Sequence, residues 1–325
     1  AALANTNRHV VSAAYTPEDA EKVVEMGKIL AGSEEGLRER PLLSFIVSLI
    51  NSPLTFDSTA ARTLIAVART NLPVTLSAAP MAGSTAPVTL AGTLVQLHAE
   101  ELAGIVFTQL VNPGVPVIYG GIPSMADMRR LSYIGGAVEY GMMNAAIAQM
   151  SRYIDVPVYN SAGVTESKEP DVQAVYEKSF AILQCALAGS NCVHHAAGML
   201  ESLLTVSAEQ MVIDDEIIAM ARRAIRGIEV TGDRLAFDAI QAVGPGGNYL
   251  TQEHTMRYLR GEFLEPALAD RNMRETWEQT GMKGIREKAN EKARNILKEA
   301  NPHPPCIPDE ADTRIREQLN IVLER

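Results

Sequence analysis

The amino-acid sequence predicts an α/β protein built as a (β/α)8 TIM-type barrel. Short runs rich in Val, Ile and Leu recur along the chain, with starts 32, 32, 41, 41 and 36 residues apart, and amphipathic stretches lie between them. This spacing allows each unit to close a right-handed parallel crossover. The runs are continuously apolar, which indicates strands buried on both faces, as in a parallel sheet under helices.

Six strands are predicted, and helices follow them in order. The predicted strands are residues 10–15, 42–49, 74–79, 115–120, 156–160 and 192–197. The helices after the first five strands are predicted at residues 17–31, 59–69, 90–110, 137–153 and 171–187. Thr16 and Ser58 precede the first two helices and carry side chains that cap a helix N-terminus.

Six units do not complete an eight-stranded barrel, and we expect two strands to be missing at the amino end. Residues 1–7 show no pattern of their own directly before the first strand, which suits a chain that begins partway through a domain. A Rossmann-type domain is the weaker alternative because no Gly-x-Gly-x-x-Gly turn is present. The glycine-containing segments 83–85 and 244–247 lack a phosphate-loop ending and are predicted to be structural turns.

The chain is predicted to divide into a barrel, residues 1–250, and a C-terminal helical extension, residues 251–325. Further helices are predicted at residues 214–228 and 234–243, after Thr251 through residue 260, and at 277–300 and 309–323. A proline-rich stretch separates the last two. We interpret the extension as an arm that packs on the barrel, on a second subunit or on a partner.

Composition excludes several classes of protein. The formal charge of −10 and the pI near 5.2, without a cluster of Lys and Arg, argue against a nucleic-acid partner. Three widely spaced cysteines provide neither a disulfide framework nor a zinc ribbon and suit a reducing compartment. The first residues lack the pattern of a secretory signal, and no apolar run is long enough to cross a membrane. The sequence therefore predicts a cytoplasmic protein without a membrane partner.

Polar residues at the predicted strand ends are the candidates for chemistry, since barrel enzymes place their sites there. His194 and His195 are neighbours on a strand, so only one of them is expected to enter the barrel. Cys192 and His194 share a face, so a zinc site that uses both as ligands is an alternative to a core cysteine and a hydrogen-bonded histidine. Tyr119 and Tyr159 offer aromatic faces for a cation. A tyrosine at a strand end is about as often part of the pocket wall as a contact to the ligand. The five candidate substrate-binding residues are Tyr119, Tyr159, Asn160, His194 and Glu201.

Four segments resemble the trimethylamine methyltransferase family. They are Pro-Met-Ala-Gly-Ser-Thr-Ala-Pro-Val-Thr-Leu-Ala-Gly (80–92), Gln-Leu-Val-Asn-Pro-Gly-Val-Pro-Val-Ile-Tyr-Gly-Gly (109–121), Tyr-Asn-Ser-Ala-Gly-Val-Thr-Glu-Ser-Lys-Glu-Pro-Asp-Val-Gln-Ala (159–174) and Val-Gly-Pro-Gly-Gly-Asn-Tyr-Leu (243–250). The resemblance covers essentially the whole chain, which is similar to the carboxyl-terminal two thirds of a family member. It implies transfer of a methyl group from a methylated amine to the cobalt of a separate corrinoid protein.

Founding members of that family carry pyrrolysine on a barrel loop that resembles residues 161–165 here, with Val164 as the approximate equivalent. Valine cannot form a covalent adduct with a tertiary amine. The chain therefore resembles the non-pyrrolysine branch, which includes glycine betaine methyltransferases, and a quaternary amine is the expected substrate. A quaternary ammonium releases a neutral amine, so its demethylation requires positioning rather than a general acid or a metal.

The expected partners are a cognate corrinoid protein, whose cobalamin accepts the methyl group, a small methylated amine and further copies of the same chain. No tightly bound cofactor and no metal are expected. Two alternatives stay open at this point. One is a zinc-dependent barrel enzyme, and the other is an inactive or purely interacting form, because a barrel without two strands exposes sheet edges.

Overall fold

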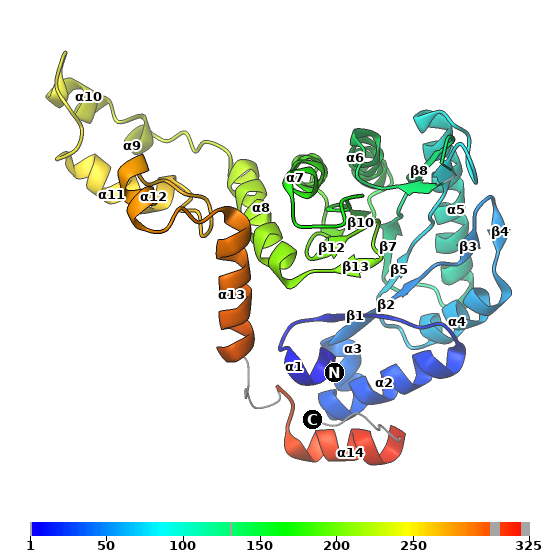
Figure 1. Ribbon diagram of the computed structural model, residues 1–325. Helices are drawn as coiled ribbons and strands as arrows, with labels where there is room; N and C mark the ends of the chain where they lie inside the picture. The colour runs from blue at the N-terminus through cyan, green and yellow to red at the C-terminus, as the bar shows by residue number, and fades with distance from the viewer. Residues whose placement is uncertain (1, 131, 300–305, 320–325) are drawn as a thin grey trace.

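A computed structural model describes residues 2–130, 132–299 and 306–319. Its centre is a curled sheet of six parallel strands that neighbour one another in the order in which they occur along the chain (Figure 1). These strands are β1 (Val10–Ala13), β2 (Leu43–Val47), β5 (Val74–Leu76), β7 (Val117–Gly120), β10 (Val158–Ser161) and β11 (Cys192–His194). All six predicted strands are thereby confirmed. The sheet is compatible with part of a barrel, and the expected two further strands stay a prediction.

Each strand is followed by a helix that returns over the same side of the sheet (Figure 1). These helices are α2 (Pro17–Ala31), α4 (Ser58–Arg69), α5 (Leu90–Val111), α6 (Val138–Tyr153), α7 (Val172–Leu187) and α8 (Ala208–Arg226). The Thr16 side chain accepts a hydrogen bond from Asp19 N, which confirms the predicted cap of α2. Asp57 caps α4 instead of Ser58, because its carboxylate accepts from Ala60 N at 2.7 Å.

The main core lies between the sheet and the helix layer. Leu43 and Phe45 of β2 and Val74 of β5 are fully buried against Leu64 and Val67 of α4. The edge strand β1 alternates half-buried and exposed residues, whereas four of the five residues of β2 are buried. Burial of a large aliphatic side chain contributes about 2 kcal/mol, so this layer holds the sheet in place.

Three small sheets lie outside the six-stranded one, and the sequence pattern did not predict them. They are β3 (Ile50–Asn51) with β4 (Thr55–Phe56), β6 (Met81–Ala82) with β8 (Ser124–Asp127) and β9 (Ser132–Ile134), and β12 (Met199–Leu200) with β13 (Thr205–Val206). All three follow the carboxyl ends of main strands and are too short to show a periodic pattern.

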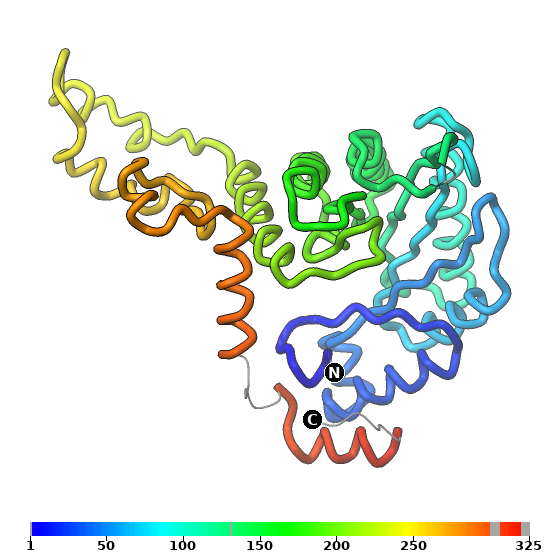
Figure 2. Tube along the Cα trace, viewed as in Figure 1, coloured from blue at the N-terminus to red at the C-terminus, as the bar shows by residue number. Residues whose placement is uncertain are grey.

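The chain leaves the sheet after α8 and forms an arm of short helices that stands away from the body (Figures 1 and 2). The arm contains α9 (Gly232–Leu235), α10 (Phe237–Val243), α11 (Glu253–Glu262) and α12 (Arg274–Gln279), and α13 (Ile285–Glu299) brings the chain back along α8. Two short helices, α1 (Ala2–Asn5) and α3 (Glu34–Glu39), lie near α2, and α14 (Asp309–Leu319) packs on α2 through Ile315 and Ile29.

Several predicted helix boundaries were wrong. Helix α8 begins at Ala208 rather than at residue 214, because Ser207 caps it by accepting from Gln210 N. Helix α11 follows Gln252 and receives no side-chain cap from Thr251. The single helix predicted over 277–300 is two helices that are separated where Gly281 has a φ of +94°. Two predicted helices extend beyond the described residues. Residue 300 of the first and residues 320–323 of the second lie outside them.

No helix in the described ranges is long and apolar enough to cross a membrane. The division of the chain into domains at residue 250 stays a prediction.

Candidate functional site

Two faces of the curled sheet must be distinguished before any site can be assigned. Residues paired in parallel register point to the same face, and neighbours along a strand point to opposite faces. Tyr159 pairs with Cys192 and Ser161 pairs with His194, so these four side chains share one face. It is the face away from the helix layer, and we call it the inner face. Tyr119 and Asn160 belong to the opposite, helix-covered face.

Tyr159 and His194 are joined on the inner face. The Tyr159 hydroxyl and His194 Nδ1 are hydrogen-bonded at 2.8 Å, and their rings lie 5.4 Å apart. Tyr159 is buried, and burial raises the pKa of its phenol above the ordinary value. His194 keeps an exposed edge, but the partial burial of its ring lowers its pKa. Both groups are therefore uncharged near pH 7.

His195 also lies on the inner side, which corrects the expectation that only one of the two histidines enters. Strand β11 ends at His194, and His195 has a φ of +61°, so the alternation of faces is lost there. Its Nδ1 is hydrogen-bonded to the Ser161 hydroxyl at 2.8 Å, and its ring stacks on His194 at 3.7 Å. Burial, with His194 and Lys178 adding to it, lowers the pKa of His195 to about 4.

The loop after β10, residues 161–165, is buried throughout, and Val164 is completely enclosed. A methyl group added at Gly135 would meet Val164 at 2.5 Å and Tyr133 at 2.9 Å, so Gly135 lies between these two side chains. On its other side the loop touches the segment after β11, because Gly163 approaches the Ala196 backbone and Ala162 N donates to His194 O. The loop therefore connects the histidine pair to the β8–β9 hairpin.

Two carboxylates fix this loop. Glu166 accepts hydrogen bonds from Gly135 N at 2.7 Å, from Gly136 N and from the Ser202 hydroxyl. Glu177 of α7 accepts from the Thr165 hydroxyl and from Glu166 N. These carboxylates order the backbone around Val164.

The structure does not bring all five predicted candidates together. The Tyr119 hydroxyl is hydrogen-bonded to His98 of α5, and the Asn160 amide donates to Asn144 O of α6, so both serve the helix layer. Glu201 lies in the β12–β13 turn, where its carboxylate accepts from the Thr205 hydroxyl. Only Tyr159 and His194 meet.

Sequence reasoning missed Tyr133 and Tyr140 as neighbours of this site. Burial raises the pKa of Tyr133 to about 12 and also raises that of Tyr140 well above its ordinary value. Both hydroxyls are buried without a well-formed hydrogen bond among the described residues, although each phenol influences the other's pKa. Tyr133 follows a turn-rich segment and Tyr140 lies within a helix, so neither stands at the carboxyl end of a predicted strand.

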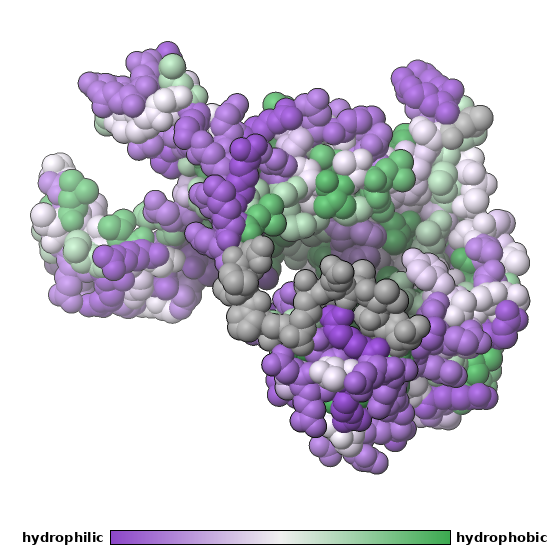
Figure 3. Space-filling view, turned by 60° about the horizontal axis from the view of Figure 1, so that its bottom comes forward, coloured by the Kyte–Doolittle hydropathy of each residue, from purple (hydrophilic) through white to green (hydrophobic). Residues whose placement is uncertain are grey.

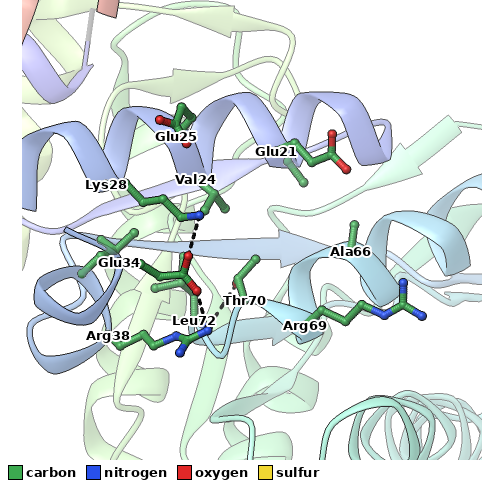
Figure 4. Close-up of a pocket in the computed structure, with 12 residues that line it drawn as sticks. Glu21, Val24, Glu25, Lys28, Glu34, Arg38, Ala66, Arg69, Thr70 and Leu72 are labelled. Atoms are coloured by element: carbon green, nitrogen blue, oxygen red, sulfur yellow. Dashed lines mark hydrogen bonds and ion pairs between the residues drawn. The ribbon is translucent and has the colours of Figure 1, made fainter. Parts of the chain in front are cut away.

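A cleft of about 440 Å³ lies elsewhere, between α2, α3 and α4 (Figure 4). Glu34 joins both Lys28 and Arg38 there, and the Lys28 ammonium lowers the pKa of that carboxyl. Thr70 and Leu72, which also line the cleft, directly precede β5. The cleft is therefore at the amino ends of the strands, where conserved structure in barrels serves stability rather than chemistry.

Comparisons with known proteins identify the family of this chain. The family model described as trimethylamine methyltransferase (MTTB) matches residues 1–320. The chain belongs to the trimethylamine methyltransferase family.

Two proteins of Desulfitobacterium hafniense are among the relatives of this chain. The chain is 38% identical to a glycine betaine methyltransferase of strain Y51, over 97% of the chain and 65% of that protein. It is 37% identical to trimethylamine methyltransferase MttB of strain DCB-2, over 96% of the chain and 62% of that protein. Trimethylamine methyltransferase MttB of Methanosarcina barkeri is also 37% identical, over 91% of the chain and 59% of its own length. The chain thus spans less than two thirds of the length of these relatives.

A buried ion pair holds the backbone near His194 and His195 in place. Lys178 Nζ of α7 lies 2.9 Å from Asp214 of α8, and neither side chain is exposed. Lys178 also donates to Met199 O, and Asp214 accepts from Gly198 N at 2.7 Å. The pair therefore fixes residues 198 and 199, which begin three residues after His195.

The described residues contain no group of three or more His, Cys, Asp or Glu side chains arranged to hold a metal ion. Cys192 and His194 share the inner face as expected, and Cys192 is exposed there. The thiol itself is partly covered, and this partial burial raises its pKa, which keeps it protonated near pH 7.

Proposed function

We propose that the protein transfers a methyl group from a quaternary methylated amine, such as a betaine, to the Co(I) of a separate corrinoid protein. Membership of the trimethylamine methyltransferase family supports methyl transfer. The relatives carry two kinds of name, glycine betaine methyltransferase and trimethylamine methyltransferase, so the choice between a quaternary and a tertiary amine depends on the residues of this chain.

The observation that carries the proposal is the uncharged cluster of Tyr159, His194 and His195 on the inner face. The pKa values of both imidazoles are lowered and that of the phenol is raised. A site for a permanent cation must not carry a positive charge of its own, and aromatic faces attract such cations. His194 has the exposed edge and is the residue that we place against the substrate.

Tyr159 acts on the substrate through His194. Its hydroxyl lies 2.8 Å from His194 Nδ1, and a phenol that donates to this atom leaves the imidazole neutral with its proton on Nε2. Tyr159 itself is buried beneath the surface of the inner face. We therefore assign Tyr159 as a positioning residue and His194 as the contact residue.

The loop at Val164 favours a quaternary over a tertiary amine. Val164 is aliphatic and buried, and the Ser161 hydroxyl is engaged with His195, so the loop presents no free nucleophile to a substrate nitrogen. A quaternary ammonium needs none, since loss of a methyl group leaves a neutral amine. The site then has to hold one methyl group toward the open side of the sheet.

A methyl acceptor that is carried by another protein has to reach the substrate at the carboxyl ends of the strands, where barrel enzymes place their sites. His194 is the last residue of β11 and lies at that end. When bound, the corrinoid supplies a Co(I) nucleophile for the methyl carbon. The residues of this chain bind the ammonium, hold it in one orientation and keep the imidazoles uncharged.

Methyl transfer to a cognate corrinoid protein reduced to Co(I) tests the proposal with a panel of betaines, other quaternary amines and trimethylamine. We expect transfer from at least one quaternary amine and none from trimethylamine. His194→Gln should lower kcat/KM by roughly 100-fold, a loss typical of a displaced substrate. Tyr153→Phe is the matched control, because Tyr153 is 92% exposed at the end of α6 and should have no effect.

Calorimetric titration of the protein alone with the active amine separates substrate binding from docking of the acceptor. Tyr159→Phe should weaken this binding while the fold is retained, because it removes the bond to His194 and keeps the ring. Transfer from trimethylamine but from no quaternary amine would overturn the proposal.

A further inference from the structure

A turn of three consecutive left-handed residues lies between β12 and β13. Glu201, Ser202 and Leu203 have φ values of +49°, +52° and +74°. A turn that only reverses the chain uses Gly, Asn or Asp at such positions, because other side chains are strained there. Backbone strain marks this turn more clearly than surface character does, since polar and apolar residues are interspersed over much of the face shown in Figure 3. Strain of this kind persists where the surrounding structure imposes it, and it gathers at functional sites.

The segment after β10 imposes this conformation on the turn. Glu201 N donates a hydrogen bond to Ser167 O, and Ser202 N donates to Thr165 O, each at 2.8 Å. The Ser202 hydroxyl donates to Glu166 Oε1 at 3.2 Å. Three donors of the turn are therefore directed at three successive residues of one segment.

Ser202 contributes two of these three donors, its backbone N–H and its hydroxyl. In a regular strand the N–H lies in the plane of the sheet and the side chain stands out of that plane, so the two point in different directions. A strand residue at this position would not direct both groups at one segment. The left-handed conformation of Ser202 brings both donors onto the segment after β10.

The segment that Ser202 binds continues into the buried loop beside the histidines. Glu166, which accepts from the Ser202 hydroxyl, also accepts from Gly135 N at 2.7 Å. Its carboxylate thereby joins segments that follow three neighbouring strands, β7, β10 and β11. At the other end of the loop, the Ser161 hydroxyl is bonded to His195 Nδ1 at 2.8 Å. A displacement of the turn is therefore transmitted through the loop to the histidine pair.

We propose that Ser202 is a positioning residue for the loop that contains Val164, and that the strained turn is retained because it directs both donors of Ser202 at this loop. Its two bonds fix Thr165 and Glu166, which follow Val164 directly. The effect of Ser202 on amine binding rests on the proposed function, whereas the coupling of the turn to the loop does not.

Hydrogen exchange of the loop amides, followed by mass spectrometry, tests the coupling without any assay of methyl transfer. Ala162 N, Glu166 N and Ser167 N are hydrogen-bonded, so their exchange reports the opening of the loop. Ser202→Ala removes the bond to Glu166 and should speed this exchange about fivefold, the factor that corresponds to one hydrogen bond. Unchanged exchange of the loop in this variant would overturn the proposal.

Two further variants separate positioning from a general loss of structure. Ser202→Asn retains a donor for Glu166 and introduces a residue that adopts a positive φ readily, so it should restore slow exchange. Ser84→Ala is the matched control, because it removes an exposed hydroxyl from the turn after β6 and should leave exchange of the loop unchanged. Equally fast exchange of the loop in all three variants would overturn the proposal, since the loop would then open independently of the donor at residue 202.

Calorimetric titration with the active amine tests the consequence for the site. Ser202→Ala should raise the Kd of the amine about fivefold and leave kcat at saturating amine unchanged, because binding must then order a loop that the turn no longer holds. Ser202→Asn should restore the Kd. Faster exchange of the loop with an unchanged Kd would overturn the positioning role. Failure of the unchanged protein to bind any methylated amine would contradict the proposed function, and the exchange measurements would still decide the coupling.

Discussion

The imidazole rings of His194 and His195 stack with their centroids 3.7 Å apart, although neighbouring residues of a strand should point to opposite faces. The left-handed backbone of His195, with a φ of +61°, turns its ring back over the inner face. Non-glycine residues at positive φ gather at functional sites. The stacked pair also has an electrostatic consequence, because two rings this close cannot both become cationic without repulsion.

We predict that the burial of His195, together with this repulsion, appears as a loss of stability in acid. The pKa of His195 is lowered from 6.5 to about 4 in the folded protein, so between these values the unfolded chain binds a proton that the folded chain does not. The free energy of unfolding should therefore fall as the pH falls from about 6.5 to 4. His195→Asn, which tolerates a positive φ, should flatten this part of the curve of urea unfolding against pH. Equal slopes for the two proteins would contradict the assignment.

Glu101 is predicted to make the protein less stable as the pH rises, opposite to the effect of His195. This carboxyl group is buried on α5, and burial raises its pKa from 4.5 to about 8, although Ala78 N and Gly120 N donate to it. Between these values the folded state retains a proton that the unfolded state has lost, so stability is complete below pH 4.5 and falls as the pH rises to about 8. Glu101→Gln should remove this dependence, and thermal melting between pH 5 and 8 measures it. A variant as pH-dependent as the unchanged protein would indicate that Glu101 is ionised.

The contact between Gly163 and Ala196 gives a third prediction. Gly163 has a φ of +77°, and a Cβ there would lie 2.8 Å from the Ala196 backbone. Gly163→Ala should therefore cost about 2–4 kcal/mol and weaken binding of the methylated amine, because the loop with Val164 must move. Gly114→Ala is the matched control, since Gly114 has a φ of +90° but nothing within 4 Å, and it should cost about 1 kcal/mol. Equal losses in the two variants would show that the close contact has no effect.

The order and pairing of the six main strands could be predicted from the sequence because continuous apolar runs at regular spacing identify buried parallel strands. The caps could be predicted only in part. Asp57 and Ser58 are both good cap residues, and the geometry of the preceding turn decides between them. The two-residue strands could not be predicted because they are too short to show a periodic pattern.

The sequence predicted that the candidate residues lie at strand ends, but it did not predict which face of the sheet each side chain occupies. Tyr119 and Tyr159 both occur late in a strand, yet register places Tyr119 with Val158 on the helix side and Tyr159 with Cys192 on the inner side. A shift of one residue exchanges the faces, and no sequence pattern marks it in strands that are apolar on both sides. The pairing of Lys178 with Asp214 was equally hidden, since charged residues on helices are usually exposed.

This buried pair gives the last prediction. Lys178 and Asp214 have no exposed side-chain surface, so removal of one partner leaves the other charge buried and unpaired. Lys178→Met should lower the free energy of unfolding in urea by about 3–5 kcal/mol. Adding Asp214→Asn should restore most of the loss, because the amide oxygen can still accept from Gly198 N while the charge is gone. Glu278→Gln, which breaks the exposed pair with Arg274, should leave the unfolding midpoint unchanged. A double variant no more stable than Lys178→Met would show that lost packing, rather than an unpaired charge, accounts for the effect.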